Sequence, residues 1–469
     1  MNGLLKQKKT VISTILLALL FWGCSEKTQD QPVGQYQATS DPSISITYDR
    51  LYLDQKISLY NSALDITTDQ LNSVKNSTAP LEGKLLKKGK PVDDVALSFI
   101  GEVNSASVSG VALQATDVAI KGNKAYVSYN MAGDEFLGAL QVLDISQKLK
   151  PKIEAEIVFS DMELNAVYVK GNQLFVVGAG DSSKRTLTSP AVLTVFDLSG
   201  GLPDTDVKVV DLPSFAATDV IAQGKYLYIT VGDQGGGLVR VLASQPESFD
   251  ETFDFYAVDD ARSVAVEQKT LGVLKGTDGE VRYFDTDILG NPAVDLSLVS
   301  PLRTVSMPGT ATIIHSKSVI DMPGNVTVMA LGDGGVMALL TDSTSDQTII
   351  DIPALTGVSG LTDAVTVSNA TSVNQNLLFR ANGEAGVEIF KLSQNIRSVK
   401  EGDPLTVTKL GSLAFGSLES ANGLYYRKGL LFVADGLGGM KIVEVDRNIT
   451  ATADETEDGL ELDQDEEDA

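Results

Sequence analysis

The stretch TDVAIKGNKAYV at residues 116–127, followed after a loop by LGALQVLDIS at residues 137–146, gives the pattern that this chain repeats. Each copy has a polar residue, an apolar strand, a tight turn, an aliphatic-aromatic strand, a second turn and a third apolar strand. Six further copies begin at Asn165, Thr218, Arg262, Lys317, Asn369 and Asn422. From residue 116 to residue 422 the pattern takes six steps over 306 residues, a period of about 51 residues.

A period near this length with three strands per repeat is typical of β-propeller blades, since each sheet buries its faces against neighbouring sheets. Fourth, outer strands are predicted between the repeats, at 152–159, 206–212, 252–258, 294–304, 347–352 and 405–414. The seventh outer strand is found before the first repeat, at residues 96–103. We therefore predict an all-β fold, a seven-bladed β-propeller of four-stranded blades. Its ring is closed by an N-terminal strand, which removes exposed sheet edges.

The first 24 residues are typical of an export signal. Three lysines within residues 6–9 precede a largely apolar run over residues 11–22, which suits a signal peptide and is short for a membrane span. The run ends at Gly23 and Cys24, the only cysteine of the chain. This junction resembles the lipobox of bacterial lipoproteins, which implies lipidation of Cys24 and, because Ser25 follows, sorting to the outer membrane. An ordinary signal peptide with an incidental cysteine and a signal anchor are the alternatives.

The segments on either side of the repeats have different compositions. Residues 25–44 are polar with Pro and Gly, which predicts a flexible tether. Apolar residues recur at roughly helical spacing in 45–76, which predicts one or two short helices, and a loop follows to residue 94. The propeller is expected over residues 95–446, and residues 447–469 are expected to be an acidic disordered tail.

The charge of the chain limits its partners. The formal net charge is −25, and residues 451–469 hold ten acidic residues and no basic ones. Nucleic acid and anionic lipid are therefore unexpected partners, because both would be repelled by the acidic chain. An acidic tail is usually a solvated segment. The tail resembles a calcium-binding loop only weakly, because Thr456 is a poor ligand for the ion.

The repeats also resemble a known family, the LVIVD-repeat β-propellers of exported bacterial proteins. The similarity is carried by Ala125-Tyr126-Val127 with residues 141–146, QVLDIS, and by residues 431–436, LFVADG, with residues 440–446, MKIVEVD. The fourth and fifth repeats depart from the pattern, and the resemblance covers about three quarters of the chain. It implies a cell-envelope or cell-surface lipoprotein, and it does not imply a reaction.

Aligning the seven inner strands gives two columns of residues, which we expect at one mouth of the central channel. The first column is polar or charged throughout: Thr116, Asn165, Thr218, Arg262, Lys317, Asn369 and Asn422. The second column is small throughout: Asp117, Ala166, Asp219, Ser263, Ser318, Ala370 and Gly423. The first column, with Asp117 and Asp219, is the candidate ligand-binding ring; alternatively, these residues only begin the strands and hold water. Arg262 and Lys317 could bind a carboxylate or another anion, unless Asp117 and Asp219 balance their charge.

Two functional hypotheses follow. The first is a non-catalytic binding or scaffold module for a protein, peptide or glycan, held at the membrane by a lipid on Cys24. The alternative is an enzyme at the mouth, a lactonase-like hydrolase or a lyase with a divalent cation such as Ca²⁺, for which Asp117, Asp219 and Asn165 are the first candidate ligands. No catalytic residue is singled out, because there is no Gly-x-Ser-x-Gly sequence and His315 is the only histidine. One histidine and one cysteine cannot build a zinc site of the usual kind.

Overall fold

The computed structural model describes residues 35–64, 95–131, 133, 135–232, 235–276, 279–307, 316–343, 345–416 and 419–447. The chain separates into two units, Met1–Val33 and Gly34–Ala469, and the description below concerns the second unit. Within the described residues, no helix is long and apolar enough to cross a membrane. Cys24, His315 and the acidic tail lie outside the described residues.

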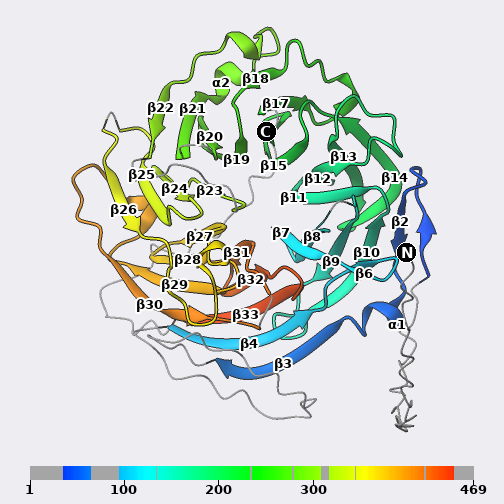
Figure 1. The fold of residues 1–469 in the computed structure, drawn as a ribbon, viewed down its shortest axis with the longest axis horizontal. Coiled ribbons are helices and arrows are strands. Elements are labelled where there is room, and N and C mark those ends of the chain that lie inside the picture. Colours follow the sequence, from blue (N-terminus) through cyan, green and yellow to red (C-terminus); the bar gives the residue numbers. More distant parts are fainter. Residues whose placement is uncertain are drawn as a thin grey trace, which may run out of the picture. The chain divides into compact units, whose positions relative to one another are not determined.

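The second unit is a ring of seven antiparallel sheets (Figure 1), which confirms the predicted seven-bladed β-propeller. In each blade the strands follow one another from the inside of the ring outwards. Blades 1 to 3 consist of β7 (Gln114–Lys121), β8 (Lys124–Asn130), β9 (Gly138–Asp144) and β10 (Lys152–Phe159); β11 (Met162–Lys170), β12 (Gln173–Gly180), β13 (Ala191–Ser199) and β14 (Leu202–Asp211); and β15 (Ala216–Gln223), β16 (Tyr226–Gly232), β17 (Gly237–Leu242) and β18 (Phe255–Ala257).

The remaining blades follow the same order. Blades 4 to 6 consist of β19 (Ala261–Glu267), β20 (Thr270–Lys275), β21 (Glu280–Asp285) and β22 (Arg303–Ser306); β23 (Ile320–Asp321), β24 (Val326–Ala330), β25 (Val336–Leu340) and β26 (Thr348–Ile352); and β27 (Ala370–Asn374), β28 (Leu377–Ala381), β29 (Val387–Leu392) and β30 (Val407–Leu413). Blade 7 contains β31 (Gly423–Arg427), β32 (Leu430–Ala434) and β33 (Met440–Arg447). The connections carry α2 (Thr286–Leu289), the 3₁₀ turns Pro246–Ser248, Leu296–Leu298, Asp363–Val365 and Ile396–Ser398, and a small hairpin of β5 (Ser107–Val108) and β6 (Val111–Ala112).

The ring closes as predicted, through a strand from the N-terminal side. Strand β4 (Val95–Val103) pairs antiparallel with β33, from Val103 opposite Met440 to Val95 opposite Arg447. A buried ion pair crosses this pairing, because Lys441 Nζ lies 3.1 Å from Glu102 Oε2. The first and last strands of the propeller therefore lie in one sheet.

The hydrophobic core lies between the blades rather than at the centre of the ring. The described residues form seven buried apolar clusters, and each cluster joins two neighbouring blades. Strands such as β16 are buried along their whole length for this reason, which is why their sequences are continuous apolar runs.

Of the helices predicted in residues 45–76, the described part, residues 45–64, contains one helical turn, α1 (Arg50–Leu53). The prediction is wrong on both sides of this turn, where the chain forms the strands β2 (Ile44–Thr47) and β3 (Ile57–Leu64). β2 extends the sheet of blade 1 next to β10, and β3 extends blade 7 next to β4. Both outer edges offer unpaired backbone groups, and pairing with these edges prevails over a weak helical spacing. Residues 65–76 lie outside the described residues.

Two other expectations are corrected at the sheet edges. The tether predicted over 25–44 is structured at its end, because β1 (Gln37–Ala38) pairs with β2. In blade 4 the predicted outer strand 294–304 is reduced to β22, since a 3₁₀ turn occupies Leu296–Leu298 and Pro301 precedes the strand.

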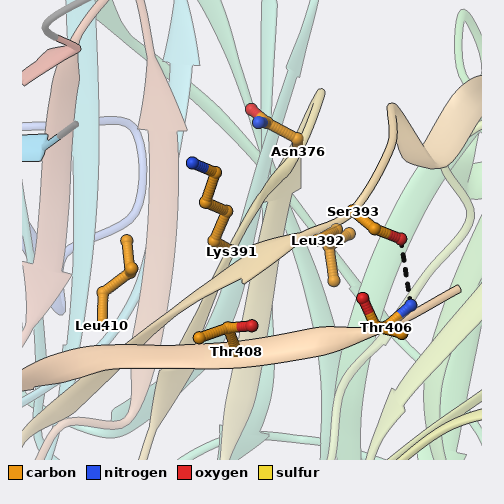
Figure 2. A pocket seen from close by; sticks show the side chains of 7 residues that line it. All are labelled: Asn376, Lys391, Leu392, Ser393, Thr406, Thr408 and Leu410. Atoms are coloured by element: carbon orange, nitrogen blue, oxygen red, sulfur yellow. Dashed lines mark hydrogen bonds between the residues drawn. The ribbon is translucent and has the colours of Figure 1, made fainter. Parts of the chain in front are cut away.

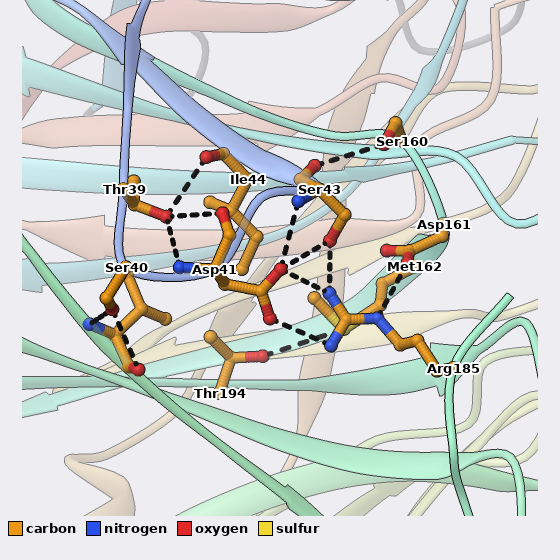
Figure 3. A network of polar contacts seen from close by, with 11 residues as sticks. Thr39, Ser40, Asp41, Ser43, Ile44, Ser160, Asp161, Met162, Arg185 and Thr194 are labelled. Carbon is orange, nitrogen blue, oxygen red and sulfur yellow. Dashed lines mark hydrogen bonds and ion pairs between the residues drawn. The ribbon is translucent and has the colours of Figure 1, made fainter.

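A network of charges fixes the first described segment to blades 1 and 2 (Figure 3). The guanidinium of Arg185 lies 2.9 Å from Asp41 and 2.8 Å from Asp161, and it also donates to Ser43. These hydrogen bonds hold the pKa of the Asp41 carboxyl below its usual value, although burial opposes the shift. We call residues 35–64 the N-terminal strap.

A second anchor of the strap is the buried carboxylate of Glu156 on β10. Lys56 Nζ lies 2.7 Å from both of its oxygens, and the hydroxyls of Tyr36 and Tyr52 donate to it at 2.6 and 2.9 Å. Gln141 donates from β9 at 2.7 Å. Burial, together with this carboxylate, raises the pKa of both tyrosine hydroxyls. The strap therefore joins blades 2, 1 and 7 across the point of ring closure.

Candidate functional site

The polar column predicted from the repeats meets at one mouth of the central channel. A cavity of ≈ 280 Å³ is lined there by Gln114, Thr116, Asn130, Asn165, Thr218, Arg262, Lys317 and Asn422. We call these eight residues the polar mouth. Six of them belong to the predicted column, and together they come from blades 1, 2, 3, 4, 5 and 7. The seventh column residue, Asn369, is buried and does not line the cavity.

The column also ties the blades together through one recurring hydrogen bond. A side chain of one blade donates to the backbone carbonyl that directly precedes the column residue of the next blade. Thr116 donates to Leu164 O at 2.9 Å, Asn165 to Ala217 O at 3.0 Å, Thr218 to Ala261 O at 3.0 Å, Arg262 to Ser316 O at 3.3 Å, Asn369 to Ala421 O at 3.0 Å and Asn422 to Ala115 O at 3.0 Å.

Blade 5 departs from this pattern. Ser316 supplies the link to blade 6, because its hydroxyl donates to Ser368 O at 2.9 Å. The side chain of Lys317 instead crosses the channel to blade 1, where Nζ lies 3.0 Å from Thr116 O and 3.1 Å from Asp117 Oδ1. The ring of links is therefore complete, and Lys317 adds a bond between two blades that are not neighbours.

Both cations of the polar mouth have a carboxylate partner. Lys317 pairs with Asp117, and Arg262 Nε lies 2.8 Å from Asp260 Oδ1. The first pairing is one that the sequence left open, whereas Asp260 was not anticipated. Asp260 lies two residues before Arg262 and therefore outside both aligned columns. Binding of an anion between Arg262 and Lys317 would therefore have to displace two ion pairs.

The two aspartates of the small column also link neighbouring blades. Asp117 Oδ2 accepts from Val167 N at 3.1 Å, and Asp219 Oδ2 accepts from Val264 N at 3.1 Å and from Ser263 Oγ. Burial, with a further contribution from the negative charge of Asp117, raises the pKa of Asp219 to about 6. The Asp219 carboxyl therefore titrates nearer to neutral pH than an ordinary aspartate.

The candidate metal ligands are engaged in these same links. Asn165 Oδ1 accepts from Asn130 Nδ2 at 3.1 Å, while Asp117 and Asp219 accept from backbone amides. In the part of the chain that the structure describes, no three His, Cys, Asp or Glu side chains gather in a group that could hold a metal ion.

A second cavity, of ≈ 380 Å³, lies on blade 6 near the turn ends of β28 and β29 (Figure 2). Its lining combines hydroxyl, amide and ammonium groups with two leucines: Asn376, Lys391, Leu392, Ser393, Thr406, Thr408 and Leu410. Ser393 Oγ accepts from Thr406 N at 3.0 Å, which joins the third and fourth strands beside the cavity. The sequence did not point to this cavity, because only the two columns at the start of the inner strands were compared between the repeats, and none of the lining residues belongs to either column.

No protein-family model matches the chain, and no curated protein matches it. Solved structures with a similar arrangement include the RRP9 WD40 repeats, at 12% identity, a TM-score of 0.49 and coverage of 76% of this chain and 100% of that one. The Myceliophteria thermophila Cps50 (Swd1) β-propeller domain matches at 11% identity and a TM-score of 0.45, covering 73% and 99%. A designed protein, Ika8, matches at 11% identity and a TM-score of 0.40, covering 73% and 99%.

These similarities are too distant to carry a ligand or an activity to this chain. The blades and registers described above define its class: it is a seven-bladed β-propeller of four-stranded antiparallel blades. The resemblance to the LVIVD-repeat family stays a prediction, as does the lipobox at Cys24.

Proposed function

We propose that this protein is a lipid-anchored module of the cell envelope that binds a protein, peptide or glycan at its polar mouth without chemical conversion. The observation that carries the proposal is the convergence of polar side chains from six blades on one concave cavity. Binding sites are commonly concave, with a few polar groups held in place by rigid elements. Here the rigid elements are the inner strands, and the hydrogen-bonded links fix the side chains.

The chemistry of the cavity favours a neutral, hydrogen-bonding ligand. Its lining includes four amide side chains and two hydroxyls, and the two cations are balanced by Asp117 and Asp260. The volume of ≈ 280 Å³ is near the lower end of small-molecule pockets, which begin at about 300 Å³. A cavity of this size accepts one residue or one sugar ring, so the ligand is a single unit projecting from a larger partner.

The experiment for the binding site blocks the cavity without removing a link between blades. Gln114→Trp fills the cavity, and Gln147→Trp is the matched control, because Gln147 is exposed in the loop between β9 and β10 at the opposite end of the strands. Partners are captured from intact cells by proximity cross-linking. The proposal predicts a defined partner that is lost with Gln114→Trp and retained with Gln147→Trp. Equal capture by both variants would contradict it.

The lipid anchor is tested separately. Growth with an alkyne-bearing fatty acid should label the wild-type protein, and Cys24→Ser should abolish the label and release the protein from the membrane fraction. A Cys24→Ser protein that still carries the label and stays in the membrane fraction would overturn the lipoprotein assignment. That result would not affect the proposal for the binding site.

A further inference from the structure

The opposite mouth of the channel is basic, although the chain is strongly acidic. Every inner strand starts near the polar mouth and ends at the turn that leads to the second strand, so these turns surround the other end of the channel. The basic side chains at these turns come from blades 1, 2, 3, 4 and 7: Lys121, Lys170, Lys225, Lys269, Arg427 and Lys428. We call these six residues the basic mouth.

Hydrogen bonds between blades hold part of the basic mouth in place. Lys121 Nζ donates to Gly171 O at 2.7 Å, and Lys170 Nζ donates to Gly224 O at 3.0 Å. Each bond joins one turn to the turn of the next blade. An ammonium has three N–H donors, so each of these lysines keeps donors for another acceptor.

Most of this positive charge is not balanced within the described residues. Lys269 pairs with Asp287 at 2.6 Å, and the nearby Glu267 pairs with Arg397 at 3.4 Å. Among the described carboxylates, none pairs with Lys121, Lys170, Lys225 or Lys428. Lys170, Lys225 and Lys428 are also exposed. A ring of like charges around one opening attracts an acidic partner.

The chain itself supplies an acidic segment at this end. Strand β33 runs away from the polar mouth, and near its end Val445 N donates to Gly429 O at 2.9 Å, beside Lys428. Residues 451–469 follow four residues after Arg447 and hold ten acidic residues and no basic ones. The described chain therefore ends, at Arg447, next to the basic mouth, and a segment tethered there by a short linker would have a high effective concentration at the mouth.

We propose that the acidic segment 451–469 occupies the basic mouth and shields it from other anions, such as the phosphate headgroups of anionic lipids. A short linker connects the segment to the last strand, β33. The charge of the segment is opposite to that of the basic mouth, and its ten carboxylates outnumber the six basic side chains. The interaction is electrostatic and exposed, so it weakens as salt shortens the screening length.

The first test is lysine acetylation of the full chain, read residue by residue by mass spectrometry. The full chain is compared with a neutralised variant, in which the ten acidic residues of 451–469 are changed to Asn or Gln and the propeller is left untouched. In low salt the change should speed acetylation of Lys170, Lys225 and Lys428 about two- to fivefold, and 1 M salt should remove the difference, because the screening length falls to about 3 Å. Lys184, which is exposed in the loop after β12 at the polar-mouth end, and Lys208, which is exposed on the outer strand β14, are the controls. Equal rates in both proteins at low salt would overturn the proposal.

The second test distinguishes the segment from lipid as the occupant. The wild type and the neutralised variant, both carrying Cys24→Ser, are mixed with phosphatidylglycerol vesicles. The proposal predicts that only the neutralised variant binds, and that Lys170→Glu with Lys428→Glu removes that binding while Lys184→Glu with Lys208→Glu does not. Equal binding of the wild type and the neutralised variant would show that headgroups, and not the segment, occupy the basic mouth.

Discussion

At the scale of single residues, the side chains that surround the polar mouth have two roles. Asn165 and Asn422 each line the cavity and donate to a carbonyl of the next blade. The link made by Asn422 lies where blade 7 meets blade 1, so it also contributes to ring closure. Stability alone can therefore explain why each repeat carries a polar residue in this column. The cavity that these residues line at the channel mouth remains available to a ligand.

Removing one link should destabilise the fold measurably. Asn422→Ala leaves Ala115 O without its partner and should lower the free energy of unfolding by about 1–2 kcal/mol, the range for an unsatisfied buried polar group. Chemical denaturation measures the change. Asn172→Ala, at an exposed turn of blade 2, is the matched control and should leave the midpoint unchanged. An unchanged midpoint for Asn422→Ala would mean that the link does not stabilise the ring.

Asp219 should make stability depend on pH. Its folded-state pKa, about 6, lies above the ordinary value of 3.8, so its stabilising contribution is complete below pH 4 and is lost as pH rises through 6. Relative to the wild type, Asp219→Asn should therefore gain about 2–3 kcal/mol between pH 4 and pH 7, at 1.36 kcal/mol per pKa unit. The comparison cancels other titrating groups. A constant difference across this range would show that Asp219 titrates normally.

At the scale of elements, the N-terminal strap explains how the outer edges of the ring are covered. β2 and β3 add to blades 1 and 7, and α1 lies between them, next to β10. Lys56 of the strap pairs with the buried carboxylate of Glu156. Arg185 of blade 2 pairs both with the buried Asp161 and with Asp41 of the strap. The strap is therefore a structural part of the propeller and not a flexible extension.

The Lys56–Glu156 pair should be the strongest single contact of the strap. Lys56→Met leaves a fully buried carboxylate with only neutral donors, and it should lower the free energy of unfolding by about 2–4 kcal/mol. Lys269→Met removes an exposed ion pair and should have no measurable effect. Limited proteolysis adds a second readout, since the strap should be cleaved earlier in Lys56→Met. Equal denaturation midpoints for the two variants would refute a structural role for the pair.

At the scale of the whole molecule, the ring depends on a strand that comes before the first repeat. Deleting residues 1–105 removes β4 and the strap and exposes the outer edge of β33, so the remaining chain should lose cooperative unfolding in calorimetry. Deleting residues 1–34 removes no described strand and should preserve it. A 1–105 deletion that melts as cooperatively and as hot as the intact chain would contradict closure by β4.

Much of this architecture could be predicted because it repeats. The spacing of the inner strands placed Thr116, Asn165 and Thr218 on one ring, and the count of outer strands identified residues 96–103 as the closing strand. The contacts that do not repeat could not be predicted: Lys317 bonds a residue 201 positions away, and the strap pairs with sheet edges that only the closed ring creates. Asp260 and the blade 6 cavity were missed because they lie outside the two columns that were compared between the repeats.

The central claim is that the polar mouth is where a partner binds. The most direct measurement places a photo-activated cross-linking amino acid at Gln114, inside the cavity, and at Gln147, on the opposite face, and compares the adducts formed in intact cells. The account predicts one discrete adduct from position 114 and none of that mass from position 147. The same adduct from both positions, or only from position 147, would place the binding surface elsewhere and contradict the account.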